Sequence, residues 1–210
     1  MSMNKFFNIQ TDADGVGTIF LYGDIGDYYD VQSGRVAGEL LEAEKAGRRV
    51  NIRINSNGGE VYCGIAIYNA IKNSRADVHI YVDGIAASMA SVIALCGKPV
   101  EMSKYARLML HSVSGGCYGN KKDMQKYIEE IESLEDSLGD IYAARLGMSK
   151  DEVKSRFFDG EDHWLTADEA LRLGFIDGIY DAEPVPAGST PEQIYKIFNN
   201  RPENQPQYSD

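Results

Sequence analysis

The sequence predicts an α/β fold, in which helices alternate with the strands of a mostly parallel sheet. Three observations support this prediction. Short runs of β-branched and aromatic residues alternate with longer segments whose apolar residues recur every three or four positions. Glycines, often paired with Asp or Asn, separate many of these segments. The 210 residues are 43% apolar and 25% charged, which is the balance of a globular protein.

The first half of the chain predicts three strands separated by two helices. β-Branched and alternating apolar residues predict the strands, and a repeat of one helical turn predicts the helices. The strands are predicted at residues 17–22, 50–55 and 78–82, and the helices at 31–47 and 60–72.

The second half contains one helix that is much longer than the others. Small and apolar residues predict a buried helix at 86–95, and a short apolar strand at 108–110 ends at His111. A glycine-rich stretch follows, and then a charged helix is predicted over about residues 120–147, with apolar positions three or four apart. A short helix is predicted at 167–173.

These elements predict one domain over residues 17–180, with a short N-terminal segment at 1–16 and an extension at 181–210. Five of the six prolines lie in the extension. Within it, a capping box followed by apolar residues predicts a short helix at about 190–199, and the polar end is expected to be disordered.

Composition limits the partners and the compartment. A net charge of −11 argues against nucleic acid or an anionic membrane as the main partner. We expect no transmembrane span, because no run of roughly 18 apolar residues occurs, and no secretory signal at the start. The three cysteines form no metal-ligand pattern and suit a reducing cytoplasm, so we expect a cytoplasmic protein with no metal and no cofactor.

Chemistry in an open α/β sheet is expected beyond the carboxyl ends of strands, and Ser88 lies at such a place. It follows Gly84 and two alanines, which allow a sharp turn and close backbone approach. Backbone N–H groups at the start of the following helix would stabilise an oxyanion there. The alternative is that Ser88 is only a small residue that lets a buried helix pack tightly.

A serine nucleophile needs a base, and the chain has three histidines. His111 ends an apolar strand, which favours it as the base. His79 lies in mid-strand, typical of a packing or surface residue, and His163 is expected in a loop beside Trp164. The acidic stretch at 159–162 offers carboxylates to orient the imidazole, and it equally fits a solvated turn.

Four segments in this order resemble the ClpP peptidases, and most closely the ClpP-like head-maturation proteases of tailed bacteriophages and prophages. They are residues 54–59 (INSNGG), 84–91 (GIAASMAS), 107–111 (RLMLH) with Gly115-Gly116, and 162–170 (DHWLTADEA) with 174–177 (GFID). The resemblance covers most of the chain from about residue 17 to 179. It implies the ClpP/crotonase-like fold of stacked βαβ repeats with a protruding handle helix.

The resemblance also implies the roles of individual residues. Ser88 would be the nucleophile, His111 the general base and then acid, and Asp162 the orienting acid, with Asp159 as the alternative third member. The N–H groups of Gly59 and Met89 would form the oxyanion hole. The Gly115-Gly116 segment would pair with an extended polypeptide substrate by strand addition.

The family further implies a homo-oligomer, either a heptameric ring or two stacked rings that make a tetradecamer, with the active sites inside a closed chamber. An AAA+ unfoldase is a candidate partner, although the short N-terminal segment lacks the family's axial-loop pattern. Two other functions stay open: a catalytically silent ring or scaffold subunit, and an acyl-CoA enzyme of the crotonase type.

Overall fold

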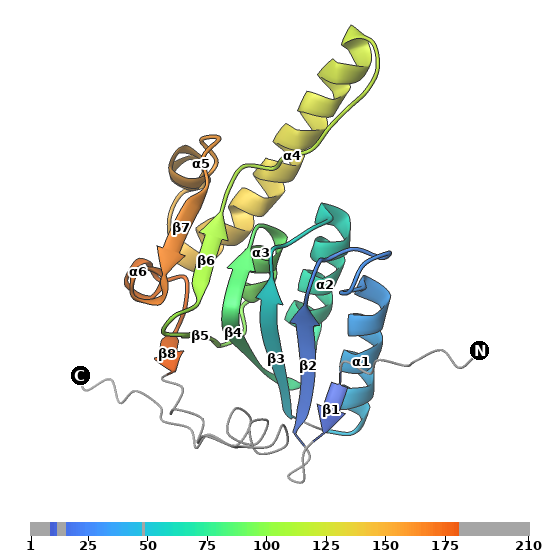
Figure 1. Ribbon diagram of the computed structural model, residues 1–210, viewed down its shortest axis with the longest axis vertical. Coiled ribbons are helices and arrows are strands. Elements are labelled where there is room, and N and C mark those ends of the chain that lie inside the picture. Colours follow the sequence, from blue (N-terminus) through green and yellow to red (C-terminus); the bar gives the residue numbers. More distant parts are fainter. Residues whose placement is uncertain (1–8, 12–15, 48, 181–210) are drawn as a thin grey trace.

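The alternation of strands and helices is confirmed by the computed structural model, which describes residues 9–11, 16–47 and 49–180 (Figure 1). The strands are β1 (Ile9–Thr11), β2 (Gly17–Tyr22), β3 (Arg49–Ser56), β4 (Asp77–Ala87), β5 (Val100–Ser103), β6 (Arg107–Leu110), β7 (His163–Thr166) and β8 (Gly178–Tyr180). The helices are α1 (Ser33–Lys45), α2 (Val61–Asn73), α3 (Met89–Ala94), α4 (Lys121–Leu146), α5 (Lys150–Phe157) and α6 (Ala167–Leu173).

The sheet forks at its longest strand, β4. The main path runs β1-β2-β3-β4-β5-β8 and is parallel except for the antiparallel β1–β2 pair. Residues 80–82 of β4 pair with β5, whereas residues 85–87 pair with β6. β6 in turn pairs with β7 in the antiparallel sense. The fork therefore brings β6 and β7 to the carboxyl end of β4.

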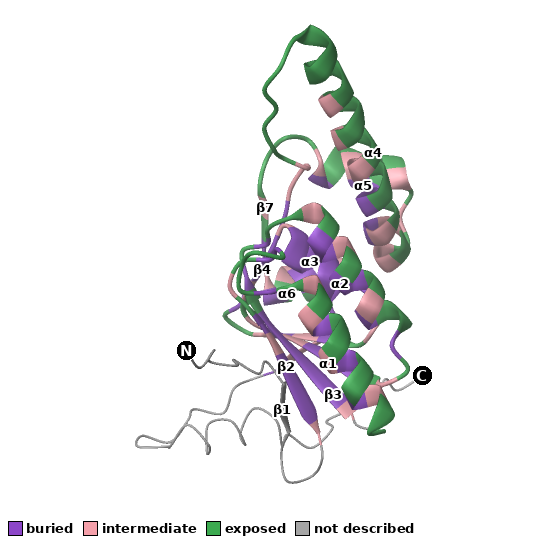
Figure 2. Ribbon diagram, turned by 90° about the vertical axis from the view of Figure 1, so that its right-hand side faces the viewer, coloured by how far each residue is buried: buried purple, intermediate pink, exposed green. Residues whose placement is uncertain are grey.

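One face of the sheet is covered by α1 and α2, and the core lies between them (Figures 1 and 2). The apolar positions of β3 alternate with polar ones, and Val50, Ile52 and Ile54 are fully buried. Val36 of α1 and Ile67 of α2 are likewise fully buried. Burial of this alternating pattern is what fixes the register of the strands.

The other face of the sheet carries a buried polar network centred on Asp83 of β4. Its carboxylate forms a two-bond ion pair with Arg53 of β3. The hydroxyls of Tyr22, at the end of β2, and Tyr180, at the end of β8, each donate to it at 2.6 Å. The Asp83 carboxylate of β4 thus contacts side chains from β2, β3 and β8. It lies just before the part of β4 that pairs with β6.

One predicted helix was wrong in extent. Ala86 and Ala87 were expected in a helix over 86–95, but they continue β4, because they pair with Leu108 and Met109 of β6. The helix is reduced to α3, and Ser88 is the residue before it.

Five short elements were not predicted: β1, β5, β7, β8 and α5. His163 was expected in a loop and is instead the first residue of β7.

Helix α4 extends well beyond the rest of the domain (Figure 1). It begins with a capping box, in which Asn120 accepts from the N–H of Asp123 and the Asp123 carboxylate accepts from the N–H of Asn120. It ends at Gly147 in the left-handed conformation. This matches the handle helix expected over about 120–147.

The boundaries proposed at residues 16 and 180 remain predictions. The helix expected at about 190–199 lies outside the described residues, as does most of the segment 1–16. Of the helices in the described part of the chain, none has the length and hydropathy needed to cross a bilayer.

Candidate active site

The candidate site lies where β3, β4 and β6 end, next to the base of α4. Each of these strands is followed by residues that the sequence singled out: Gly58-Gly59, Ser88 and His111. Parallel pairing of β4 with both β3 and β6 places all three carboxyl ends at one edge of the sheet.

Ser88 occupies a turn with an unusual backbone. Its φ of 54° and ψ of −126° make it the one non-glycine residue with positive φ in the part of the chain that is described. Such a conformation costs on the order of 1–3 kcal/mol and is common at functional sites. The N–H of Ser88 donates to the carbonyl of Met109 at 3.0 Å, which ties the turn to β6. The turn therefore presents the serine hydroxyl at the sheet edge instead of in the helix.

His111 meets this hydroxyl directly. Its Nε2 atom lies 2.8 Å from Oγ of Ser88, within hydrogen-bonding distance. Because Ala87 and Met109 are register partners on adjacent strands, the residues that follow them stay close across the edge. The two side chains that the sequence proposed as nucleophile and base are thus brought together.

Two further residues support the Ser88 turn and were missed by sequence reasoning. The carbonyl of Ser88 accepts from the hydroxyl of Ser91 at 2.6 Å, and the Ser91 hydroxyl lies 2.8 Å from that of Tyr142 on α4. Tyr142 is almost fully buried, and this burial raises the pKa of its hydroxyl. Two features of the sequence could have indicated these residues. Ser91 is a polar residue inside an apolar run, and Tyr142 is an aromatic residue near the end of a charged helix.

The two glycines after β3 approach the Ser88 turn closely. Gly58 has a φ of 99°, and a Cβ there would lie 2.7 Å from Cβ of Ser88 and 3.0 Å from the backbone N of Met89. Gly59 has a φ of 150°, and a Cβ there would collide with the Ile25 carbonyl. Within the described residues the N–H groups of Gly59 and Met89 donate to no carbonyl. Their role as an oxyanion hole stays a prediction.

The acidic stretch separates into two carboxylates with different partners. Oδ1 of Asp162 lies 3.6 Å from Nδ1 of His111, and its side chain is 57% exposed. Oδ1 of Asp159 lies 2.8 Å from Nε2 of His163. The hydrogen bond from His163 is the main reason that the pKa of Asp159 falls below its ordinary value of 3.8. Of the two candidates for the third member, Asp162 is the one that faces His111.

The segment after His111 has no regular structure through residue 118, and it runs beside α4 (Figure 1). Its start is fixed by the N–H of Val113, which donates to the Glu135 carboxylate at 3.0 Å. Gly115 and Gly116 are exposed, and a Cβ at Gly115 would collide with the Tyr127 hydroxyl. No strand partner for this segment is present among the described residues, so its pairing with a substrate stays a prediction.

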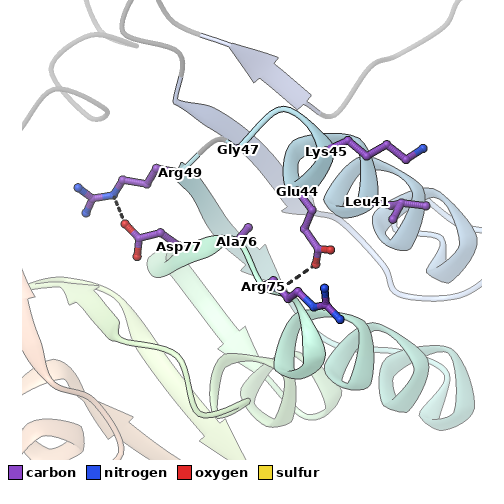
Figure 3. Close-up of a pocket in the computed structure, with 8 residues that line it drawn as sticks. All are labelled: Leu41, Glu44, Lys45, Gly47, Arg49, Arg75, Ala76 and Asp77. Atoms are coloured by element: carbon purple, nitrogen blue, oxygen red, sulfur yellow. Dashed lines mark hydrogen bonds and ion pairs between the residues drawn. The ribbon is translucent and has the colours of Figure 1, made fainter.

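A pocket of about 550 Å³ lies at the opposite end of the sheet, near the amino ends of β3 and β4 (Figure 3). Figure 3 shows that charged side chains line it, with Arg49 beside Asp77 and Glu44 accepting from the backbone of Arg75. β4 begins at Asp77 and ends just before Ser88, so this pocket is separate from the candidate site.

Comparison with known proteins gives consistent matches. The model of the Clp protease family matches residues 3–183. Two relatives, from two strains of Bacteroides fragilis, are both called ATP-dependent Clp protease proteolytic subunit. Each is 35% identical over 165 residues, which is 77% of this chain and 77% or 73% of the relative.

Proposed function

Because the chain belongs to the Clp protease family, a family of serine peptidases, we propose that it hydrolyses peptide bonds through an acyl-enzyme at Ser88. The observation that carries the proposal is the 2.8 Å distance between Oγ of Ser88 and Nε2 of His111. A serine hydroxyl is a weak nucleophile until a base takes its proton, and this distance allows that transfer.

In the first half-reaction, Oγ of Ser88 attacks the scissile carbonyl carbon while its proton passes to Nε2 of His111. Nδ1 of the ring carries a proton toward Asp162, whose negative charge stabilises the imidazolium. The N–H groups of Gly59 and Met89 stabilise the tetrahedral oxyanion. Collapse of this intermediate breaks the C–N bond, and His111 protonates the departing amine.

In the second half-reaction, water replaces the amine. His111 takes a proton from the water as its oxygen attacks the acyl ester of Ser88, and the oxyanion forms again in the same place. Collapse breaks the ester bond, releases the carboxylic acid and returns the proton to Ser88. The 3.6 Å separation between Asp162 and His111 is longer than an ordinary hydrogen bond, and catalytic contacts often tighten when substrate binds.

The proposal includes a closed assembly and a natural substrate. The projection of α4 supports a role in joining two heptameric rings, and the exposed glycines after His111 support strand addition of an extended polypeptide. The resemblance to phage and prophage proteases supports capsid or scaffold proteins as substrates. The names of the relatives include ATP dependence, which supports an AAA+ unfoldase as a partner.

A fluorophosphonate probe, which labels an activated serine, tests the chemistry. We expect the wild type to be labelled and to cleave peptides, and Ser88→Ala or His111→Ala to lose about 10⁶ in turnover. His79→Ala removes a histidine of β4 far from the site and should react like the wild type.

Equal labelling of the wild type and His111→Ala would contradict the proposal. Ring-sized assemblies, detected by native mass measurement, that never react with the probe would favour the silent subunit. Tight binding of an acyl-CoA thioester would favour the crotonase type.

A further inference from the structure

A second imidazole–carboxylate pair lies beside the candidate catalytic one. Nε2 of His163 is 2.8 Å from Oδ1 of Asp159, and the same oxygen accepts from the N–H of Glu161 at 3.0 Å. Residues 159 and 163 bracket the short loop that carries Asp162. The pair therefore closes this loop across its ends.

The loop is also fixed on its inner side. The N–H of Gly160 donates to the hydroxyl of Ser112, the residue after His111, at 3.1 Å. Gly160 has a φ of 94°, a conformation that glycine adopts readily. The loop is thus attached both to its own following strand and to the segment that leads away from the base.

The strand register explains why these attachments matter for Asp162. β6 and β7 are antiparallel with Leu110 opposite His163, so His111 and Asp162 are the next residues across from each other beyond the last pair. The ladder ends at the Leu110–His163 pair, so Asp162 lies one residue beyond it. Its side chain is 57% exposed and 3.6 Å from His111, so its position depends on the loop backbone.

His163 connects the loop to the core. Its ring packs edge-on against Phe157 with centroids 5.7 Å apart, and Phe157 packs in the same way against the fully buried Phe175 at 5.5 Å. The imidazole that bonds to Asp159 therefore packs against one buried aromatic ring, Phe157, which in turn packs against a second, Phe175. The hydrogen bond from His163 to Asp159 thereby fixes the start of the loop to the packed core.

We propose that Asp159 and His163 form a positioning pair that keeps the carboxylate of Asp162 opposite His111. The inference rests on the proposed peptidase function, and neither residue of the pair touches the reacting atoms. Breaking the pair releases the loop end, so that Asp162 spends less time near Nδ1 of His111. The imidazolium that forms in the transition state then loses a stabilising negative charge, which slows the step in which His111 accepts the proton.

Four variants separate the hydrogen bond from the charge. Asp159→Ala removes both, and Asp159→Asn keeps an acceptor oxygen without the charge. His163→Phe keeps a ring against Phe157 and removes the hydrogen bond. Glu161→Gln removes a charge from the same loop without touching the pair, and is the matched control.

Two readouts are needed. The first is steady-state peptide hydrolysis, in which we expect Asp159→Ala and His163→Phe to lose about 10- to 100-fold in kcat, with KM nearly unchanged. Asp159→Asn and Glu161→Gln should stay within about threefold of the wild type. The second is the downfield NMR signal of the Nδ1–H proton of His111 in the Ser88→Ala background, which reports its contact with Asp162. There, Asp159→Ala and His163→Phe should shift or weaken this signal more than Glu161→Gln does.

The outcomes distinguish this inference from the proposed function. The inference would be overturned if the wild type cleaves peptides and the Asp159→Ala and His163→Phe variants match Glu161→Gln in kcat and in the Nδ1–H signal of His111. A wild type without hydrolysis or labelling would overturn the function, while the change in the Nδ1–H signal of His111 would still report on the pair. If Asp159→Ala does not fold, His163→Phe decides the matter alone.

Discussion

Replacing Asp83 with alanine tests the buried network on the sheet face opposite α1 and α2. The Asp83 side chain is 14% exposed and its ion-pair partner Arg53 is 4% exposed. Two tyrosine hydroxyls also donate to this carboxylate, each at 2.6 Å. The substitution therefore takes one shared acceptor away from three donors at once.

The expected loss of stability follows from these contacts. Removing one partner of a buried ion pair costs about 3–5 kcal/mol, because the remaining charge stays in a poorly solvated place. The tyrosine hydrogen bonds belong to the same network, so their loss does not simply add. We expect a decrease of about 4 kcal/mol in the free energy of unfolding. For a chain of this size, that is a decrease of about 8–16 °C in Tm.

Urea unfolding followed by circular dichroism, together with calorimetry, measures this change. Glu42→Gln is the matched control, because Glu42 pairs with Lys45 on the surface, with side chains 72% and 60% exposed. That control should change stability by no more than about 0.5 kcal/mol. An Asp83→Ala variant within about 1 kcal/mol of the control would refute the reasoning that this network stabilises the fork of the sheet.

Two further predictions concern the serine turn and the buried hydroxyls. Gly58→Ala should abolish probe labelling, because its Cβ would collide with Ser88 and the φ of 99° disfavours alanine. The control Gly38→Ala, whose Cβ meets no atom within 4 Å, should be labelled normally. Equal labelling of the two variants would contradict the close approach of Gly58 to Ser88. Burial raises the pKa of Tyr142 and Tyr180 above the ordinary 10.0, so the folded state holds their protons more tightly than the unfolded state does. Their contribution to stability is therefore complete below pH 10 and lost as pH rises beyond it. Absorbance at 295 nm should show these tyrosines ionising only on unfolding, and normal titration of all 13 in the folded protein would contradict this.

The parts of the fold that the sequence predicted have strong periodic signals. β3 alternates polar and apolar residues from Arg49 to Asn55, and α4 repeats its apolar residues over many turns. β5, β7 and β8 have three or four residues each, too few for a pattern to emerge, and α5 is mostly charged. The places of these three strands are determined by pairing, β5 with β4, β7 with β6 and β8 with β5, and α5 packs against α4.

The sequence predicted which residues form the candidate site, but it did not predict the backbone conformation that brings them together. Ser88 and His111 were identified by their places at the ends of apolar segments, but Ser88 was expected at the start of a longer helix. Only the pairing of Ala87 with Met109 shows why the chain stays extended up to the serine. The sequence left Asp159 and Asp162 as alternatives, because the choice depends on the antiparallel register of β6 and β7.

The positive φ at position 88 also limits which side chain could act there. Serine and cysteine carry a single heavy atom on Cβ and tolerate this conformation at moderate cost. Threonine has a hydroxyl of comparable reactivity, but it is β-branched, and such residues are rarely found with positive φ. The φ angle of residue 88 therefore favours serine or cysteine over threonine as the nucleophile, independently of how reactive each side chain is.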